Sequence, residues 1–306
     1  MPSSGGTRRS RTTDRGRAWF VAGFLAPATL LYAVFVVLPV CQAFQISLYR
    51  WRGISEQKTF VGLANFQRLA GDEVFRQALG HNLAFLLVGG AVTLGLAMAV
   101  AHAIHGNGRW ARVIRGVYLF PQIISMVVVA VLWMFVYNPS FGILKASMQS
   151  LGLGRFAMDW LGTPGTALPA VLVTFVWHAV GFHIMLFSAG LRTIPAEVQE
   201  AATLDGADGM LRFRQVTLPM LFPVLRVAIV YMVIGALNVF ALVYLMTVGG
   251  PDRRTEVMLT YLYEQAFKHS DFGYGTALAV ANFAVVMALS GLAMLLLRRD
   301  PTEARA

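Results

Sequence analysis

The chain has 306 residues, of which 57% are hydrophobic and only 13% are charged, and its formal net charge is +10. An average soluble domain has about 25% charged residues, so this composition excludes an ordinary soluble domain and favours a membrane protein. The basic residues are scattered arginines near the ends of apolar segments, which is not the pattern of a nucleic-acid-binding surface. The single cysteine, Cys41, excludes an intrachain disulfide and a thiolate zinc site.

Six apolar segments are long enough to cross a bilayer, which takes about 20 helical residues. Every Asp, Glu and Lys lies outside these segments, as expected from the cost of placing a charge in lipid. The sequence therefore predicts an all-α membrane protein with six transmembrane helices. The predicted spans are 18–46, 78–104, 114–137, 167–190, 223–247 and 275–297.

The positions of the arginines indicate the orientation of these spans. More than half of the 25 lysines and arginines fall in the segments that are cytoplasmic if both termini are cytoplasmic, and the positive-inside rule favours that arrangement. Residues 1–17 then form a basic, disordered cytoplasmic tail, and residues 299–306 form a second tail. A cleaved secretory signal is the alternative for the N-terminus, but the apolar segment that follows is about twice as long as in such signals.

In this orientation three loops are predicted to lie on the extracytoplasmic side of the membrane: 47–77, 138–166 and 248–274. They are too short to form a catalytic domain. The second loop has turn residues at both ends and an amphipathic middle, which predicts a short surface helix.

The longest predicted cytoplasmic segment contains the stretch EAATLDGADGMLRFRQVTLP. Pro195 is typical of a first helical turn, and Gly206 is predicted to end this helix in a left-handed conformation. Asp208 is then expected to cap a second helix that runs to about Val216, and Pro219 is expected to end it. The segment is therefore predicted to form two short helices joined by a glycine turn.

Two interpretations of this pair of helices remain open on the pattern alone. The first is a surface loop that folds back on its own bundle. The second is a docking element, in which Glu200 and Asp205 present charge to a partner and the apolar residues Met210 and Phe213 hold the element in the partner's cleft.

The same stretch resembles the EAA loop, E-A-A-x(3)-G-x(n)-L-P, of permease subunits in binding-protein-dependent ABC importers. Most of the chain outside the first 17 residues is similar to the carbohydrate branch of that family, which includes the maltose and glycerol-3-phosphate permeases. Supporting segments are FVGLANFQRL at 60–69, FPQIISMVVVAVLWMFVYNPSFG at 120–142, GGPDRRTEVMLTYLYEQAF at 249–267 and DFGYGTALAV at 271–280. The residues that match the EAA loop are Glu200, Ala201, Ala202, Asp205, Gly206, Ala207, Leu218 and Pro219.

The resemblance implies a type I importer permease fold over residues 18–298, with a cytoplasmic coupling loop at 192–222, in a bacterial inner membrane. It implies four kinds of partner: a second, homologous permease, two ATP-binding-cassette ATPase subunits, an extracytoplasmic sugar-binding protein and the sugar itself. For the coupling loop, the resemblance implies that Glu200 makes the charged contact to the ATPase, that Ala201 and Ala202 form the close-packing surface, and that Gly206 forms the turn.

The chain itself has no Walker A pattern, so it is predicted not to bind or hydrolyse ATP, and no cofactor or metal site is expected. Two other classes of protein fit less well. An ion-coupled secondary transporter normally has carboxylates at membrane depth, and a membrane-embedded enzyme needs a set of catalytic side chains there. The predicted spans contain neither.

Uncharged polar residues in the spans are candidates for the substrate pathway. His178 and Phe182 share one face of the fourth predicted span, and Tyr231 and Asn238 share one face of the fifth. They can bind a sugar or join helices, and the sequence does not decide between these roles. Because no Lys or Arg lies deep in a span, a neutral mono-, di- or oligosaccharide is favoured over glycerol 3-phosphate, although the pattern does not identify the sugar.

Overall fold

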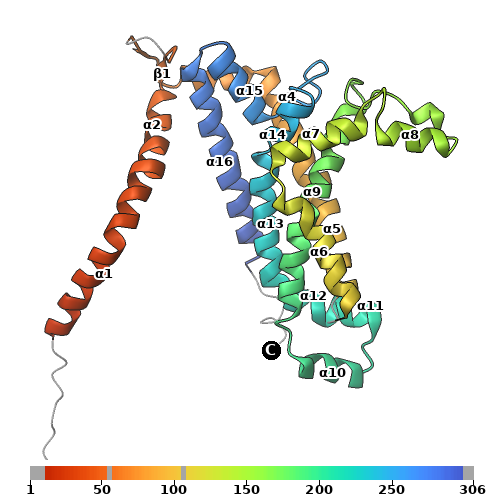
Figure 1. Ribbon diagram of the computed structural model, residues 1–306. Helices are drawn as coiled ribbons and strands as arrows, with labels where there is room; N and C mark the ends of the chain where they lie inside the picture. Colours follow the sequence, from red (N-terminus) through yellow and green to blue (C-terminus); the bar gives the residue numbers. More distant parts are fainter. Residues whose placement is uncertain (1–10, 54–56, 105–107, 299–306) are drawn as a thin grey trace, which may run out of the picture.

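The computed structural model describes residues 11–53, 57–104 and 108–298. Within these ranges the chain is helical apart from turns and one small antiparallel pair of strands, β1 (Tyr49–Arg50) and β2 (Thr59–Phe60), which confirms the all-α class. Five helices are long and apolar enough to span a membrane, and a sixth span results if two helices joined by a sharp bend are counted as one. Figure 1 shows these helices as a bundle from which α1 stands apart.

The spanning helices are built from the following elements. The first is α1 (Arg11–Tyr32), a π-helical stretch (Ala33–Val37) and α2 (Leu38–Ile46); the second is α4 (Glu73–Ala84), another π-helical stretch (Phe85–Gly89) and α5 (Gly90–Ala103). The others are α6 (Arg109–Ile123), α7 (Met126–Tyr137), α9 (Ala167–Leu191), α13 (Phe222–Leu237), α14 (Ala241–Met246) and α16 (Phe272–Leu296).

Two of these helices begin earlier than their apolar segments. The first starts at Arg11, so the prediction of a disordered tail through residue 17 is wrong for residues 11–17, while residues 1–10 and 299–306 lie outside the described ranges. The second starts at Glu73 rather than at residue 78, because the Asp72 carboxylate accepts hydrogen bonds from the backbone N–H groups of Val74 (2.8 Å) and Phe75 (3.1 Å). A helix start is set by such a cap and not by hydropathy.

The span predicted at 114–137 is broken in the structure. The chain bends by 102° between α6 and α7, and Ile124 and Ser125 have extended backbone conformations at the bend. Pro121 lies in the last turn of α6, where its missing N–H removes one helical hydrogen bond. This weakens the turn that precedes the break.

Close contacts between α9 and its neighbours hold the bundle together. A Cβ atom at Gly181 of α9 would collide with the carbonyl oxygen of Tyr118, so glycine allows α6 to pack directly on α9. The Phe85 and Phe175 rings meet edge to face at 5.3 Å in the largest core cluster, and the Tyr137 hydroxyl donates to the Ala170 carbonyl of α9 at 3.1 Å. The helices therefore join through close apolar packing and through interhelical hydrogen bonds such as that of Tyr137.

The end of the bundle that contains β1 is held by long-range polar contacts. It also contains the short helices α3 (Ala64–Gly71) and α15 (Met258–Tyr263) and a π-helical stretch (Glu264–Lys268). Besides its cap contacts, Asp72 accepts hydrogen bonds from the hydroxyls of Tyr261 and Tyr274, both at 2.5 Å. Burial acts to raise the pKa of the Asp72 carboxyl, but these hydrogen bonds outweigh it, so its pKa lies below the ordinary value.

Two further contacts fix the loop before α15 at the same end. Asn82 donates to the Ala236 carbonyl at 2.8 Å and accepts from the Met258 N–H at 2.9 Å, so it joins α4, α13 and α15. Arg253 makes two hydrogen bonds to Glu264, at 2.7 and 3.0 Å, and this partner raises the pKa of the guanidinium.

In the neighbouring predicted loop, the short helix expected between residues 138 and 166 is found as α8 (Ile143–Ser150), which projects from the bundle (Figure 1).

Candidate functional site

A small pair of helices closes the end of the bundle opposite β1 (Figure 1). The first is α10 (Ala196–Leu204), and the second runs through α11 (Gly209–Arg212), a π-helical stretch (Phe213–Thr217) and α12 (Leu218–Met220). We refer to residues 196–220 as the knob. Pro195 lies just before α10 as its N-cap residue instead of in its first turn.

The turn between the two helices has the left-handed conformation expected at Gly206, with φ of +77°. The Ala207 N–H donates to the Ala202 carbonyl at 2.8 Å, and the Gly206 N–H donates to the Thr203 carbonyl at 3.1 Å. These two bonds form a Schellman motif, in which the residues at the positions of Ala202 and Ala207 make an apolar contact. Both alanines are buried. The spacing between the alanines and the glycine in E-A-A-x(3)-G is therefore the spacing that this helix end requires.

The remaining residues at the front of the knob face outward. Glu200, Ala201 and Asp205 are exposed, whereas Ala202 is not. Of the two alanines expected to form one packing surface, only Ala201 is accessible, because Ala202 packs inside the knob's own turn. Leu204 is also 89% exposed, although it is apolar.

The second helix differs from its prediction in two respects. It continues beyond Val216 to Met220, and Pro219 lies in the first turn of α12 instead of ending the helix, because the preceding π-helical stretch shifts the hydrogen-bonding pattern and the proline N–H is not needed there. Phe213, expected to be a partner's anchor, instead packs on the chain's own His102 with ring centroids 4.9 Å apart. Met210 remains 70% exposed, so the outward apolar surface of the knob includes Met210, Leu204 and Leu211.

A polar cleft of about 640 Å³ lies between the knob and the end of α9. Glu200 lines it together with two arginines, Arg192 and Arg212. Arg212 also donates a hydrogen bond to the Thr203 hydroxyl at 3.2 Å, which links the two helices of the knob. Opposite charges are therefore presented side by side at this end of the molecule.

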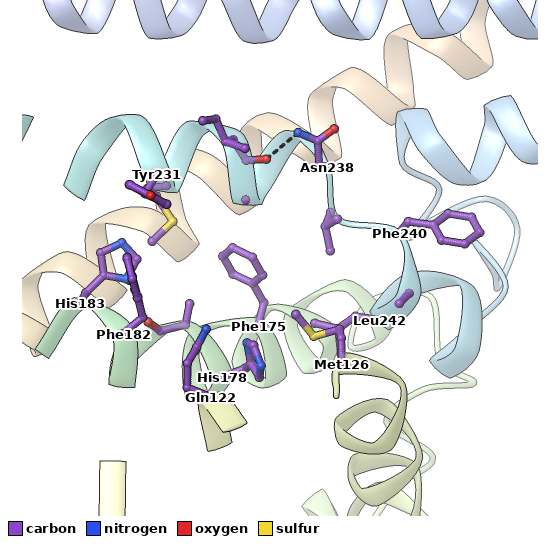
Figure 2. Close-up of a pocket in the computed structure, with 16 residues that line it drawn as sticks. Gln122, Met126, Phe175, His178, Phe182, His183, Tyr231, Asn238, Phe240 and Leu242 are labelled. Carbon is purple, nitrogen blue, oxygen red and sulfur yellow. Dashed lines mark hydrogen bonds between the residues drawn. The ribbon is translucent and has the colours of Figure 1, made fainter. Parts of the chain in front are cut away.

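A second site is a cavity of about 550 Å³ within the bundle, between α9, α13 and the bend after α6. All four predicted pathway residues line it: His178 and Phe182 from α9, and Tyr231 and Asn238 at the α13 side. Figure 2 shows the residues of the two helices facing one another across the cavity. The Phe182 and Tyr231 rings are 5.2 Å apart.

Asn238 also marks an interruption of the fifth predicted span. Its side-chain amide donates to the Ile234 carbonyl of its own helix at 2.9 Å, and α13 ends at the preceding residue, before α14 begins at Ala241. The side-chain oxygen of Asn238 (Oδ1) accepts a 3.3 Å hydrogen bond from the Asn282 side-chain amide of α16. Asn238 thus joins two helices as well as facing the cavity, and its role in binding sugar stays a prediction.

The sequence reasoning did not select several other residues that line the cavity, among them Gln122, Phe240 and Phe175. Gln122 is an amide inside a predicted span, which is the signal that selected His178, so it was available from the sequence. Phe240 and Phe175 gave no such signal, since an aromatic residue in an apolar span is usually part of the core. No Asp, Glu, Lys or Arg is among the described residues that line the cavity, and no group of three or more His, Cys, Asp and Glu suited to a metal ion occurs in the described ranges.

A family model described as "Binding-protein-dependent transport system inner membrane component" matches residues 91–299, about two thirds of the chain. The chain belongs to this family. Its members are permease subunits, which are transport components without ATPase activity of their own, so the permease is a multi-pass membrane protein and not an ATPase.

Relatives place the permease among the sugar ABC importers, as the EAA-loop resemblance predicted. It is 34% identical to the diacetylchitobiose uptake system permease protein NgcF of Streptomyces coelicolor, over 96% of this chain and 86% of that protein. It is 32% identical to the trehalose/maltose transport system permease protein MalF of Thermococcus litoralis, over 87% of this chain and 89% of that protein. It is 36% identical to the probable ABC transporter permease protein YurN of Bacillus subtilis, over 89% of this chain and 93% of that protein.

The fold of the permease is that of a known importer. A crystal structure of a bacterial ABC transporter that imports the acidic polysaccharide alginate contains a chain that superimposes with a TM-score of 0.80, at 23% identity and over 94% of this permease and 98% of that chain. This similarity confirms the importer permease fold.

Proposed function

We propose that the permease forms half of the translocation pathway of an ABC importer for a mono-, di- or oligosaccharide and couples transport to ATP hydrolysis by a separate ATPase subunit. In this proposal the knob is seated in a cleft of the ATPase. Glu200 makes the charged contact, and Ala201, Leu204 and Met210 make the apolar one. Two ATPase subunits, a second homologous permease and an extracytoplasmic sugar-binding protein complete the transporter.

The observation that supports this proposal is the connection between the knob and the cavity. The chain passes from α9 directly into α10, and from α12 directly into α13. The same α9 contributes His178 and Phe182 to the cavity, and α13 contributes Tyr231. In this proposal, a displacement of the knob is transmitted through α9 and α13 to both walls of the cavity. The contacts between the cavity and the sugar then differ between the two positions of the knob, as coupling between two sites requires.

The knob then lies in the cytoplasm, and both chain termini lie on that side as well. The arginine distribution supports this orientation. The β1 end, with α3 and α15, faces the extracytoplasmic side, where a binding protein delivers sugar.

The chemistry of the cavity supports a neutral sugar as the substrate. Aromatic rings at Phe182, Tyr231 and Phe240 provide flat apolar surfaces, and His178, Asn238 and Gln122 provide hydrogen-bonding groups without formal carboxylate or guanidinium charge. A glycerol-3-phosphate-type permease would have to bind the phosphate through its partner subunit, because no arginine or lysine is among the described lining residues.

Reconstitution of the complete transporter in liposomes tests the proposal. We expect sugar uptake to require the ATPase subunit, ATP and the binding protein, and we expect Tyr231→Ala or Asn238→Ala to lower uptake while basal ATP hydrolysis is retained. Uptake that follows an ion gradient without the ATPase would contradict the proposal, and stimulation by glycerol 3-phosphate alone would contradict the sugar assignment.

A further inference from the structure

A continuous series of aromatic rings extends from the cavity to the β1 end of the permease. Consecutive ring centroids are 5.1, 5.0, 5.1, 5.4 and 5.9 Å apart. The six residues, in order from the cavity, are Phe240, Tyr244, Tyr263, Phe267, Phe272 and Trp51. We refer to them as the aromatic track.

The track is not part of the core. None of its six residues belongs to the buried clusters that hold the bundle together, and Phe267 is 61% exposed. The rings come from separate segments: α14 and the residue before it, the end of α15, the π-helical stretch, the start of α16 and the loop after β1. Tertiary structure therefore assembles a row of rings that sequence periodicity does not predict.

The two ends of the track differ. Phe240 lines the cavity. Near the other end, next to Trp51, the Phe272 ring packs directly against the backbone of Gly53, where a Cβ atom would collide with it. Between these ends, Tyr244, Tyr263 and Phe267 keep accessible surface, and two of the three have a hydroxyl. The track is thus anchored at its outer end and open along its middle.

We propose that the aromatic track is an entry path that binds the apolar faces of pyranose rings and passes a saccharide from the extracytoplasmic side into the cavity. The axial C–H groups of a pyranose form a flat apolar face that packs on an aromatic ring, and the ring's hydroxyl groups remain free to bond with Tyr244, Tyr263 and Asn238. Successive rings about one sugar unit apart suit a substrate with more than one pyranose ring. This inference rests on the proposed function and adds a substrate class, pyranose di- or oligosaccharides, to it.

Lipid and the second permease are the other occupants that such a surface can have. Continuity with the cavity favours the saccharide, because the same row of contacts begins at a cavity-lining ring.

Uptake by the reconstituted transporter tests the track, with glucose, maltose, trehalose, diacetylchitobiose and glycerol 3-phosphate as probes. We expect Tyr263→Leu and Phe267→Leu each to lower uptake of the best disaccharide about three- to tenfold, the range expected when one ring contact is lost. Uptake of glucose should fall less, and basal ATP hydrolysis should not change. Tyr263→Phe and Phe267→Tyr keep the ring and should retain most of the uptake.

The control is Phe135→Leu, which removes a ring of similar exposure (59%) from α7, outside the track. Unchanged disaccharide uptake in both leucine variants, with a wild-type transporter that imports sugar, would overturn the track and leave the proposed function intact. Loss of the second permease from the purified variants would assign the rings to a subunit interface instead. A wild-type transporter that imports none of the sugars would contradict the proposed function and the track together.

Discussion

The two ends of the permease bundle are held by different kinds of contact. The knob takes its shape from bonds between near neighbours, such as the Ala207 N–H to the Ala202 carbonyl. The β1 end depends on contacts between distant parts of the chain: Asp72 binds Tyr274 across 202 residues, and Asn82 binds Met258 across 176 residues. A short-range element can move as a unit without disturbing the fold, whereas the β1 end ties several helices together. This difference suits the proposed roles of the two ends, a mobile coupling element at the knob and a fixed extracytoplasmic end at β1.

The largest effect on stability is expected at the β1 end. Asp72→Ala removes the cap of α4 and both tyrosine hydrogen bonds, so we expect the free energy of unfolding to fall by about 2–4 kcal/mol. Denaturant unfolding in detergent micelles measures this change. The matched control is Asp208→Ala, since Asp208 is also an N-cap residue but makes no side-chain cap bond. Equal losses in the two variants would show that the two ends are not held differently.

The contribution of Asp72 should also depend on pH. The pKa of Asp72 in the folded protein is below the ordinary value of 3.8. Its stabilisation is therefore complete above the ordinary pKa and is lost as the pH falls from there through the lower pKa of the folded protein. The difference in unfolding free energy between the wild type and Asp72→Asn should therefore shrink between pH 6 and pH 3, as unfolding at each pH can show. A difference that grew as the pH fell would mean that the carboxylate is not the stabilising form.

A smaller loss of stability but a large loss of function is expected in the knob. Gly206→Val places a β-branched residue at a φ of +77°, which costs about 1–2 kcal/mol. A Cβ atom there meets no neighbour within 4 Å, so the effect is conformational and not steric. We expect the protein to insert normally while ATP-driven uptake falls about tenfold or more.

Gly206→Asn is the control for this variant, because asparagine adopts the left-handed conformation more readily than valine. It should retain most of the uptake in the same liposome assay. Equal uptake by the valine and asparagine variants would show that transport does not depend on the conformation of this turn.

The smallest effect on stability is expected at Leu204, which is 89% exposed. Leu204→Ser should change the free energy of unfolding by less than about 0.5 kcal/mol. If the side chain is buried in the ATPase cleft, the affinity for the ATPase should nevertheless fall about tenfold, as measured by titration of the detergent-solubilised subunits. Unchanged affinity would remove Leu204 from the proposed contact surface.

The comparison of the two ends also explains how much could be predicted from sequence. The shape of the knob was accessible because a Schellman motif depends on residues six positions apart or fewer, and Gly206 identifies it. The pathway candidates were accessible because His178, Tyr231 and Asn238 are polar residues in apolar spans, which are rare, and Phe182 shares a helix face with His178. All four line one cavity. Their roles in binding sugar stay predictions.

The remaining features depend on contacts that a local pattern does not contain. The aromatic track joins Trp51 to Phe272 and Tyr244 to Tyr263 only after the helices have packed. The bend after α6 is marked by Pro121, but a proline in a span is compatible with either a kink or a full break. Hydropathy also misses the helical residues 11–17, because a helix can continue beyond the apolar segment into polar sequence.

Association of the permease with its ATPase subunit tests the central claim most directly. Glu200→Lys reverses the charge that the knob presents, and Glu73→Lys makes the same reversal at an exposed position on the opposite end of the bundle. We expect Glu200→Lys to abolish copurification of the ATPase from detergent and ATP-driven sugar uptake in liposomes, while Glu73→Lys retains both. Normal copurification and uptake by Glu200→Lys would contradict the assignment of the knob as the coupling element.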